Sequence, residues 1–166
     1  MNTNNKKGFT LVELVVVIAI IGVLAAILIP TMLSYVKKSR MRTANANAKV
    51  VYNTAKTSAT GYVGDGKKAH DVTVSGEPGD LVSQATDEYE EKVYGDIANV
   101  MKQNGAGSGK LALFMDEDTY IGYAQWTAVK TVSDGDSGQI IGQYPDPPKE
   151  VSESESISFG TKFDPA

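Results

Sequence analysis

An uninterrupted apolar run stands near the start of the chain. Residues 14–29 read LVVVIAIIGVLAAILI, sixteen positions without a polar side chain. With residues 9–13 the run reaches twenty-one residues, which as an α-helix extend about 31 Å and match the ~30 Å hydrocarbon layer of a bilayer. The twelve Leu, Ile and Val residues of 14–29 favour insertion by very roughly 4 to 7 kcal/mol, which outweighs about 3 kcal/mol for the one charge, Glu13. The pattern therefore predicts a membrane-spanning helix over residues 9–30.

From residue 31 the pattern changes to that of an amphipathic helix. Apolar positions recur at spacings of three and four, and they are Met41, Ala44, Ala48, Val51, Ala55, Ala59 and Tyr62. The alanines make this face smooth, which suits close packing against a sheet. Gly61 and Gly64 end the pattern, so residues 31–62 are expected to continue the first helix to a total length of roughly 80 Å.

Residues 65–166 have the pattern of a separate α+β head domain. A short strand is expected at 71–75 and a helix at 87–103, where Asp87 and Glu90 stand at capping-box spacing. Further β-type runs follow at 111–115, 120–129, 138–144 and 156–163. The expected fold class is α+β, a long N-terminal helix packed against a C-terminal antiparallel sheet.

Charge separates the two halves of the chain. Residues 1–64 sum to +7, whereas residues 65–166 sum to −11, and the whole chain carries −4. The acidic balance argues against a nonspecific nucleic-acid binder, and no sequence-specific nucleic-acid motif is evident. With no cysteine and a single histidine, the chain lacks a disulfide scaffold, a cysteine nucleophile and multi-histidine zinc sites. These features do not indicate an enzyme.

The residues in front of the apolar run narrow its interpretation. A secretory signal peptide has a shorter apolar region that ends in a small-x-small cleavage site, which this run lacks. A plain membrane anchor explains the length but not the arrangement KKGFTLVE at residues 6–13. The stretch KKGFTLVELVVVIAIIGVLAAILIP, residues 6–30, resembles the N-terminal signature of type IV pilins and of type II secretion pseudopilins.

This resemblance implies a processing event and a fold. A membrane-embedded prepilin peptidase would cleave after Gly8 on the cytoplasmic side, remove residues 1–8 as a leader and leave Phe9 to be N-methylated. A glycine before the scissile bond lets the backbone enter a protease site without a side-chain clash. The type IV pilin fold is the α+β arrangement already expected.

Glu13 is expected to be an assembly determinant. It would lie five residues into the mature chain, inside or at the edge of an apolar layer, where a charge must be paired or neutralised. Cleavage supplies a nearby cation, the amine of Phe9, which stays charged on methylation. The two residues stand at i,i+4 in one helix, but the family precedent is pairing between neighbouring subunits.

Topology and helix flexibility rest partly on the resemblance. The basic residues around the run are Lys6 and Lys7 before it, and Lys37, Lys38, Arg40 and Arg42 after it. By the positive-inside rule alone, these residues place the C-terminal side in the cytoplasm. The resemblance instead implies a single-pass protein of the plasma membrane with a cytoplasmic N-terminus. The basic face beyond the run is either solvated or meets acidic head domains of neighbouring subunits.

The stretch from Gly22 to Pro30 either loses helicity on polymerisation, as in the resembling family, or is a simple kink.

Other motifs in the head domain carry weaker signals. GAGSGK at 105–110 departs from the phosphate-loop pattern, and a turn is expected. Asp134 and Asp136 alternate like calcium ligands, but position 145 holds proline where the loop needs a carboxylate, so no cofactor is expected and calcium stays a weak candidate. His70 is expected to be an exposed loop residue.

Aromatic residues and the missing disulfide leave two further points. Tyr120, Tyr123 and Trp126 do not share one strand face, so core packing is favoured over a carbohydrate-binding platform. Many members of the resembling family pin the C-terminal region with a disulfide. This chain has no cysteine, so extra sheet pairing or bound calcium would have to replace it.

The leading interpretation is a structural subunit of a type IV pilus that serves adhesion, motility or DNA uptake. Its expected partners are identical or related subunits, the prepilin peptidase/N-methyltransferase, the membrane assembly platform and, before assembly, the lipid bilayer. It would move from the plasma membrane to an extracellular surface filament. The alternatives are a pseudopilin of a type II secretion system and a membrane-anchored binding module that does not polymerise.

Overall fold

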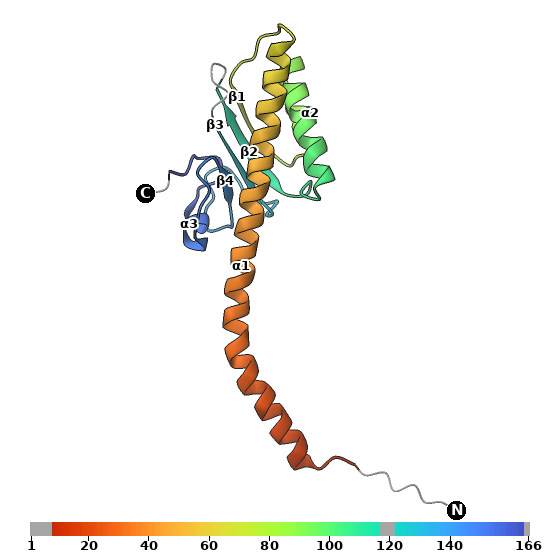
Figure 1. Ribbon diagram of the computed structural model, residues 1–166, viewed down its shortest axis with the longest axis vertical. Helices are drawn as coiled ribbons and strands as arrows, with labels where there is room; N and C mark the ends of the chain where they lie inside the picture. The colour runs from red at the N-terminus through yellow and green to blue at the C-terminus, as the bar shows by residue number, and fades with distance from the viewer. Residues whose placement is uncertain (1–7, 117–121, 165–166) are drawn as a thin grey trace, which may run out of the picture. The chain divides into compact units, whose positions relative to one another are not determined.

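The structure is a computed structural model that describes residues 8–116 and 122–164 (Figure 1). The chain divides into two compact units, Met1–Val36 and Lys37–Ala166. One helix, α1 (Leu11–Gly64), contributes its first part to one unit and the remainder to the other. Each unit is described by itself.

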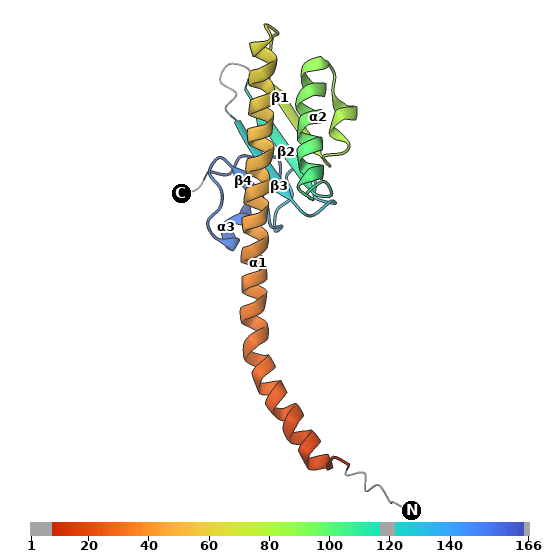
Figure 2. The ribbon, with the colours of Figure 1, turned by 45° about the vertical axis from the view of Figure 1, so that its right-hand side comes forward.

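The second unit is built on a four-stranded antiparallel sheet. Its strands are β1 (Val72–Gly76), β2 (Lys110–Met115), β3 (Gly122–Thr127) and β4 (Gly142–Tyr144), hydrogen-bonded in the order β1-β2-β3-β4. Two helices, α1 and α2 (Glu88–Gln103), lie over the same side of this sheet (Figure 2). The α+β class expected from the sequence is confirmed.

The alanine stripe of α1 forms the contact with the sheet. All seven positions that the periodicity singled out, from Met41 to Tyr62, are buried. Ala48, Ala55 and Ala59 have no exposed surface, and they join side chains of α2 and of the inner sheet face in one core. The approach is so close that a Cβ added at Gly142 of β4 would overlap the backbone of Ala44. Small residues on both elements are therefore what lets the helix lie directly on the sheet.

Helix α2 has the ends that the sequence predicts. The N-cap is Asp87, whose Oδ1 accepts a hydrogen bond from the Glu90 backbone N–H at 2.9 Å. At the other end Gly105 has a φ of 72°, and Ala106 N–H donates to the Met101 carbonyl at 2.9 Å. This is the Schellman arrangement, for which glycine is suited because it adopts positive φ without steric cost. The expected turn is confirmed: residues 105–109 connect α2 to β2, which begins at Lys110.

The outer face of the sheet is also covered. A second core cluster contains Ala112, Val132, Ile141, Ile157 and Phe159, which come from β2 and from the segments that follow β3 and β4. A 3-10 helix, η1 (Leu81–Gln84), precedes α2, and a short helix, α3 (Val151–Ser156), precedes the C-terminal segment. The outer face is therefore covered around Ala112, Gln125 and Gln143, whereas Thr73 of β1 and Phe114 of β2 remain exposed on it.

Two of the expected strands are shorter or absent. The run at 138–144 pairs only over β4, because Gly138 turns the chain with a φ of 81° and Ile141 packs into the outer cluster. The expected strand at 156–163 is wrong: α3 ends at Ser156, and Ile157 and Phe159 lie in the outer cluster instead of extending the sheet edge. The expected strand at 120–129 is described from Gly122, where β3 begins, to its end at Thr127. Residues 120–121 lie outside the described part.

Candidate functional site

The first turn of α1 holds the residues around the expected cleavage point. Glu13 Oε2 accepts hydrogen bonds from the Thr10 backbone N–H and from Thr10 Oγ1, each at 2.8 Å. The Glu13 N–H lies 3.3 Å from Thr10 Oγ1, and the Leu14 N–H donates to the Thr10 carbonyl at 3.3 Å. Thr10 is thus the N-cap and Glu13 the reciprocal partner of a capping box. Among the described residues, Glu13 Oε1 accepts no hydrogen bond.

The role of Thr10 as the N-cap of α1 was not predicted from the sequence. The signal was present, because Thr10-Leu11-Val12-Glu13 has the T-x-x-E spacing of a capping box directly before an apolar helix. Glu13 had been considered only as a charge in an apolar layer. The geometry adds that one of its oxygens orders the helix start within one chain.

The bond between Gly8 and Phe9 lies outside the helix. Both residues precede Leu11 and have no regular secondary structure, and Phe9 is 92% exposed. No atom of the described chain lies within 4 Å of a Cβ placed on Gly8. The bond is therefore open to an enzyme, while residues 1–7 of the expected leader lie outside the described part.

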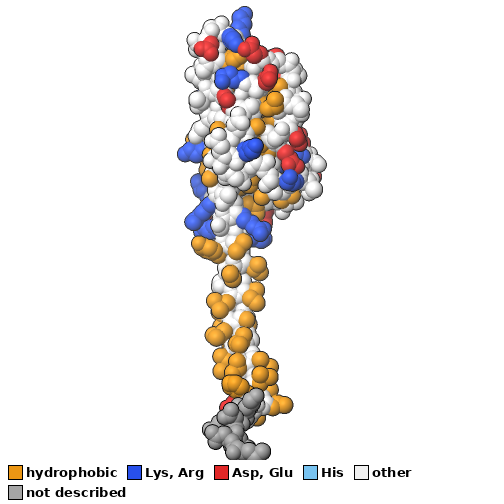
Figure 3. Space-filling model, turned by 90° about the vertical axis from the view of Figure 1, so that its right-hand side faces the viewer, with side chains coloured by type: hydrophobic (Ala, Val, Ile, Leu, Met, Phe, Trp, Pro, Cys, Tyr) orange, Lys and Arg blue, Asp and Glu red, His pale blue; other side chains and the backbone are white. Residues whose placement is uncertain are grey.

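The helix of the first unit exposes apolar side chains along its length, as the face drawn in Figure 3 shows. The large apolar residues between Leu11 and Val36 remain between 38% and 78% exposed in the isolated chain. Among the described residues, α1 is the one helix long and apolar enough to cross a membrane. So large an apolar surface requires a bilayer or other protein chains to cover it.

The proposed flexible points of this helix are both inside α1. The helix runs unbroken through Gly22 and Pro30, and Thr31 Oγ1 donates to the Leu28 carbonyl at 2.9 Å beside the proline. No atom lies within 4 Å of a Cβ placed on Gly22. Whether this stretch unwinds in a polymer stays a prediction.

In the head domain, two buried glutamines hold the C-terminal segment. Gln125 of β3 and Gln143 of β4 are register partners on the outer sheet face, and neither side chain is exposed. Gln125 accepts from the Gly160 N–H at 2.8 Å and donates to the Thr161 carbonyl at 2.7 Å. Gln143 accepts from the Phe163 N–H at 2.8 Å and donates to the Phe163 carbonyl at 2.7 Å. Each amide therefore pairs with the backbone as a neighbouring strand would.

Further contacts complete this attachment. Gln125 Nε2 also lies 3.1 Å from Gln143 Oε1, which links the two amides, and the Tyr123 hydroxyl donates to the Gly160 carbonyl at 2.7 Å. Burial raises the pKa of Tyr123. We call residues 157–163 with these three side chains the glutamine clasp. It secures the C-terminal segment without a disulfide, a solution that the sequence analysis did not foresee because buried glutamines have no short motif.

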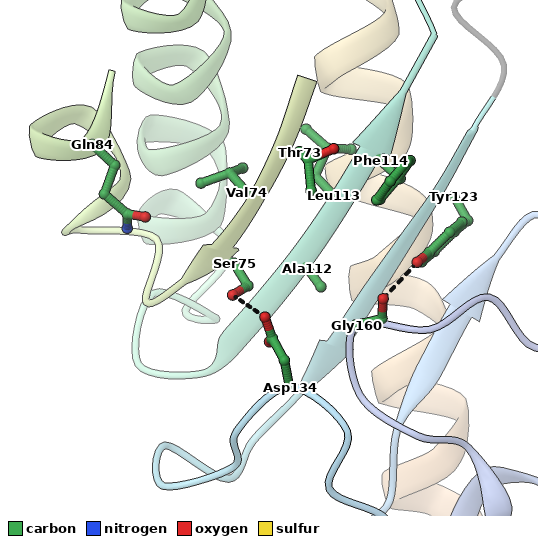
Figure 4. Close-up of a pocket in the computed structure, with 10 residues that line it drawn as sticks. All are labelled: Thr73, Val74, Ser75, Gln84, Ala112, Leu113, Phe114, Tyr123, Asp134 and Gly160. Carbon is green, nitrogen blue, oxygen red and sulfur yellow. Dashed lines mark hydrogen bonds between the residues drawn. The ribbon is translucent and has the colours of Figure 1, made fainter. Parts of the chain in front are cut away.

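The weak calcium candidates lie in the loop after β3. Asp134 Oδ2 accepts from Ser75 Oγ at 3.2 Å, beside a shallow hollow of about 200 Å³ over Ala112 (Figure 4). Asp136 Oδ2 instead accepts from the Ser133 N–H at 2.7 Å. Within residues 8–116 and 122–164, no three His, Asp or Glu side chains gather as metal ligands. Calcium binding at Asp134 and Asp136 stays a prediction.

The aromatic residues occupy different environments. Tyr123 belongs to the outer sheet face, and Trp126 belongs to the core beneath α1 and α2. Tyr120 lies outside the described residues. The two described aromatics are buried, as the sequence analysis favoured.

His70 is more constrained than a simple loop residue. Its Nε2 lies 2.7 Å from Asp87 Oδ2, and its Nδ1 lies 2.8 Å from the Asp71 carbonyl oxygen. Its ring also meets Tyr89 edge-on, with centroids 5.0 Å apart. Both nitrogens face oxygen acceptors, so the geometry favours the imidazolium, which alone donates from both. The Asp71 carbonyl and, secondarily, Asp87 raise the pKa of His70 above 6.5.

We expect the His70–Asp87 pair to make stability depend on pH. The raised pKa of His70 means that its contribution is complete below about pH 6.5 and is lost as pH rises through the higher folded pKa. The pKa of Asp87 is lowered, chiefly by the Glu90 N–H, so its contribution is lost as pH falls through that lower value. The contribution is therefore greatest between these two transitions.

Proton NMR measures the pKa of His70, the single histidine of the chain, directly. Asp87→Asn should return the His70 pKa toward 6.5, while asparagine still caps α2. A wild-type His70 pKa at or below 6.5 would contradict the expectation.

Comparison with known proteins concerns the N-terminal segment. Residues 3–29 match the family described as the prokaryotic N-terminal methylation motif. The chain is 46% identical over 50 residues to the type IV major pilin protein PilA of Myxococcus xanthus, a match to 30% of this chain and 23% of that protein. It is 60% identical over 37 residues to fimbrial protein Q of Moraxella bovis, covering 22% of this chain and 24% of that protein.

A third relative shows the same extent of similarity. The type IV major fimbrial protein FimA of Dichelobacter nodosus is 56% identical over 36 residues, 22% of this chain and 23% of that protein. The chain thus spans about a quarter of the length of the curated relatives it matches. No solved structure matches it. The N-terminal segment of the chain therefore carries the prokaryotic N-terminal methylation motif and is similar to the same segment of type IV pilins and fimbrial proteins.

Proposed function

We propose that the chain is the precursor of a type IV pilus subunit, cleaved after Gly8, methylated at Phe9 and polymerised into a surface filament. The observation that carries this proposal is the exposed apolar helix, which begins three residues after Gly8 within the methylation motif. In the plasma membrane this helix lies in the bilayer with the N-terminus in the cytoplasm. In the filament, the helices of identical subunits cover one another.

The same proposal assigns the segments of the chain. Residues 1–8 are the leader, 9–30 the membrane and filament-core helix, 31–62 its amphipathic continuation and 65–166 the head domain. The peptidase/methyltransferase and a membrane assembly platform act on the precursor. The exposed bond after Gly8 supports the assignment of residues 1–8 as a leader. The packed alanine stripe supports the assignment of residues 31–62 as the amphipathic continuation of the helix.

Glu13 has a defined task in this scheme. Its Oε2 is held by Thr10, which keeps the carboxylate at the start of the helix, and Oε1 is left to accept a further donor. Cleavage creates the Phe9 amine beside it. A growing filament brings the amine of one subunit to Oε1 of its neighbour and so neutralises both charges in the apolar core.

Mass spectrometry of the mature N-terminus tests the proposal. Surface filaments sheared from cells that carry the assembly machinery should contain chains that begin with N-methylated Phe9. Gly8→Leu should retain the leader and give no filaments, whereas Gly61→Leu, at another open glycine, should be processed normally. Mature protein that keeps residue 1 and never polymerises would contradict it. Electron microscopy then separates long pili from the short filaments of a secretion pseudopilin.

A further inference from the structure

The head domain has a hollow of about 620 Å³ beside the first residues of its part of α1. Lys37, Arg40 and Thr43 line it from α1 and Trp126 lines it from β3. Gln139 lines it from the segment before β4, and Glu155 lines it from α3. All of these residues belong to the unit Lys37–Ala166. The processing and assembly residues of the first helical turn take no part in it.

Two cationic side chains, Lys37 and Arg40, and one carboxylate, Glu155, line this hollow. Lys37 Nζ is paired with Glu155 Oε1 at 2.8 Å. Arg40 is exposed, and no carboxylate of the described chain lies within 4.0 Å of its guanidinium. The buried indole N–H of Trp126 likewise has no hydrogen-bond partner among residues 8–116 and 122–164. An occupant must therefore bring oxygen acceptors and negative charge, which a phosphate does in the geometry that arginine binds best.

The position of the hollow in the chain indicates where that phosphate comes from. Lys37 and Arg40 follow Val36, the last exposed large apolar residue of this stretch, by one and four residues, about 1.5 and 6 Å of helix. A bilayer has roughly 5 to 7 Å of headgroup layer beyond each side of its hydrocarbon. A chain anchored by its apolar run therefore holds these cations among lipid headgroups at a high effective concentration.

We propose that this hollow binds the phosphate of an anionic phospholipid headgroup while the subunit waits in the membrane. The proposal rests on the membrane anchoring set out under the proposed function. Arg40 and Lys37 hold the phosphate, and the buried side chain of Trp126 lines the same hollow. The bound headgroup fixes the depth of the unassembled subunit in the membrane. The subunit must release this lipid when it enters a filament.

Fluorescence of Trp126, the single tryptophan of the chain, reports on the hollow. The full-length chain is inserted, one copy per disc, into lipid nanodiscs of phosphatidylcholine with increasing fractions of phosphatidylglycerol. We expect a saturable change in Trp126 emission. Arg40→Gln should raise the half-saturating fraction about fivefold. Lys56→Gln removes the same charge from another exposed position of α1 and should leave that fraction unchanged.

The remaining measurements identify what occupies the hollow. An unchanged titration in Arg40→Gln, or an equal response without phosphatidylglycerol, overturns the proposal. An equal response to inorganic phosphate alone in phosphatidylcholine discs overturns the lipid as the source, and a response that appears only with two copies per disc assigns the hollow to a second chain. Failure of every variant to enter the discs counts against membrane anchoring itself, because insertion does not depend on Arg40.

Discussion

Replacing Glu13 by glutamine will reduce the yield of surface filaments by at least tenfold while leaving the start of α1 intact. Glutamine keeps a carbonyl oxygen for the Thr10 N–H, so the capping box remains. What it removes is the negative charge that we propose pairs with the Phe9 amine of a neighbouring subunit. Leaving one partner of a buried pair uncompensated costs about 3 to 5 kcal/mol, enough for a loss of that size.

Two further variants separate the charge of Glu13 from its capping role. Thr10→Val keeps the carboxylate but removes the hydroxyl that bonds to it, and it should cost about 1 kcal/mol of helix stability with little loss of filaments. Glu13→Ala removes both functions and should assemble no better than Glu13→Gln. Immunoblots of sheared filaments, normalised to total processed protein, measure the effect. Wild-type yield from Glu13→Gln would refute the charge-pairing role.

The long helix could be predicted from the sequence because its signals are local. A run of sixteen apolar residues and a stripe of small residues at spacings of three and four need no knowledge of distant partners. Even the capping box at Thr10 was present as a four-residue motif. The class of fold followed from the same patterns, since an alanine-rich face predicts a flat surface packed against it.

The C-terminal third was harder, because its structure depends on contacts between residues far apart in the chain. The β-type run at 156–163 has the composition of a strand, but its backbone pairs with glutamine side chains 20 to 36 residues away. His70 was assigned to an exposed loop because Asp87, 17 residues further along, is not visible as its partner in the sequence. Side-chain amides and lone histidines acquire their roles only from the tertiary fold.

Loss of one amide of the glutamine clasp should destabilise the head domain by about 2 to 4 kcal/mol. Gln143→Leu fills a similar volume, but it leaves the N–H and C=O of Phe163 without their side-chain partner at a partly buried site. Each buried polar group left unpaired costs about 1 to 3 kcal/mol. Gln103→Leu makes the same substitution at an exposed position of α2, and it should change the unfolding free energy by less than about 0.5 kcal/mol.

Hydrogen exchange on the full-length protein shows whether the clasp acts as one unit. In Gln143→Leu the amide of Phe163 should exchange faster, and so should that of Gly160, because the Gln125–Gln143 bond couples the two attachment points. Gln125→Leu should expose the same two amides, and the double variant should lose less stability than the two single losses added together. If each variant affected only its own backbone partner and the losses were additive, the two glutamines would be independent contacts. Cooperative release would instead mean that the clasp opens as a whole or not at all.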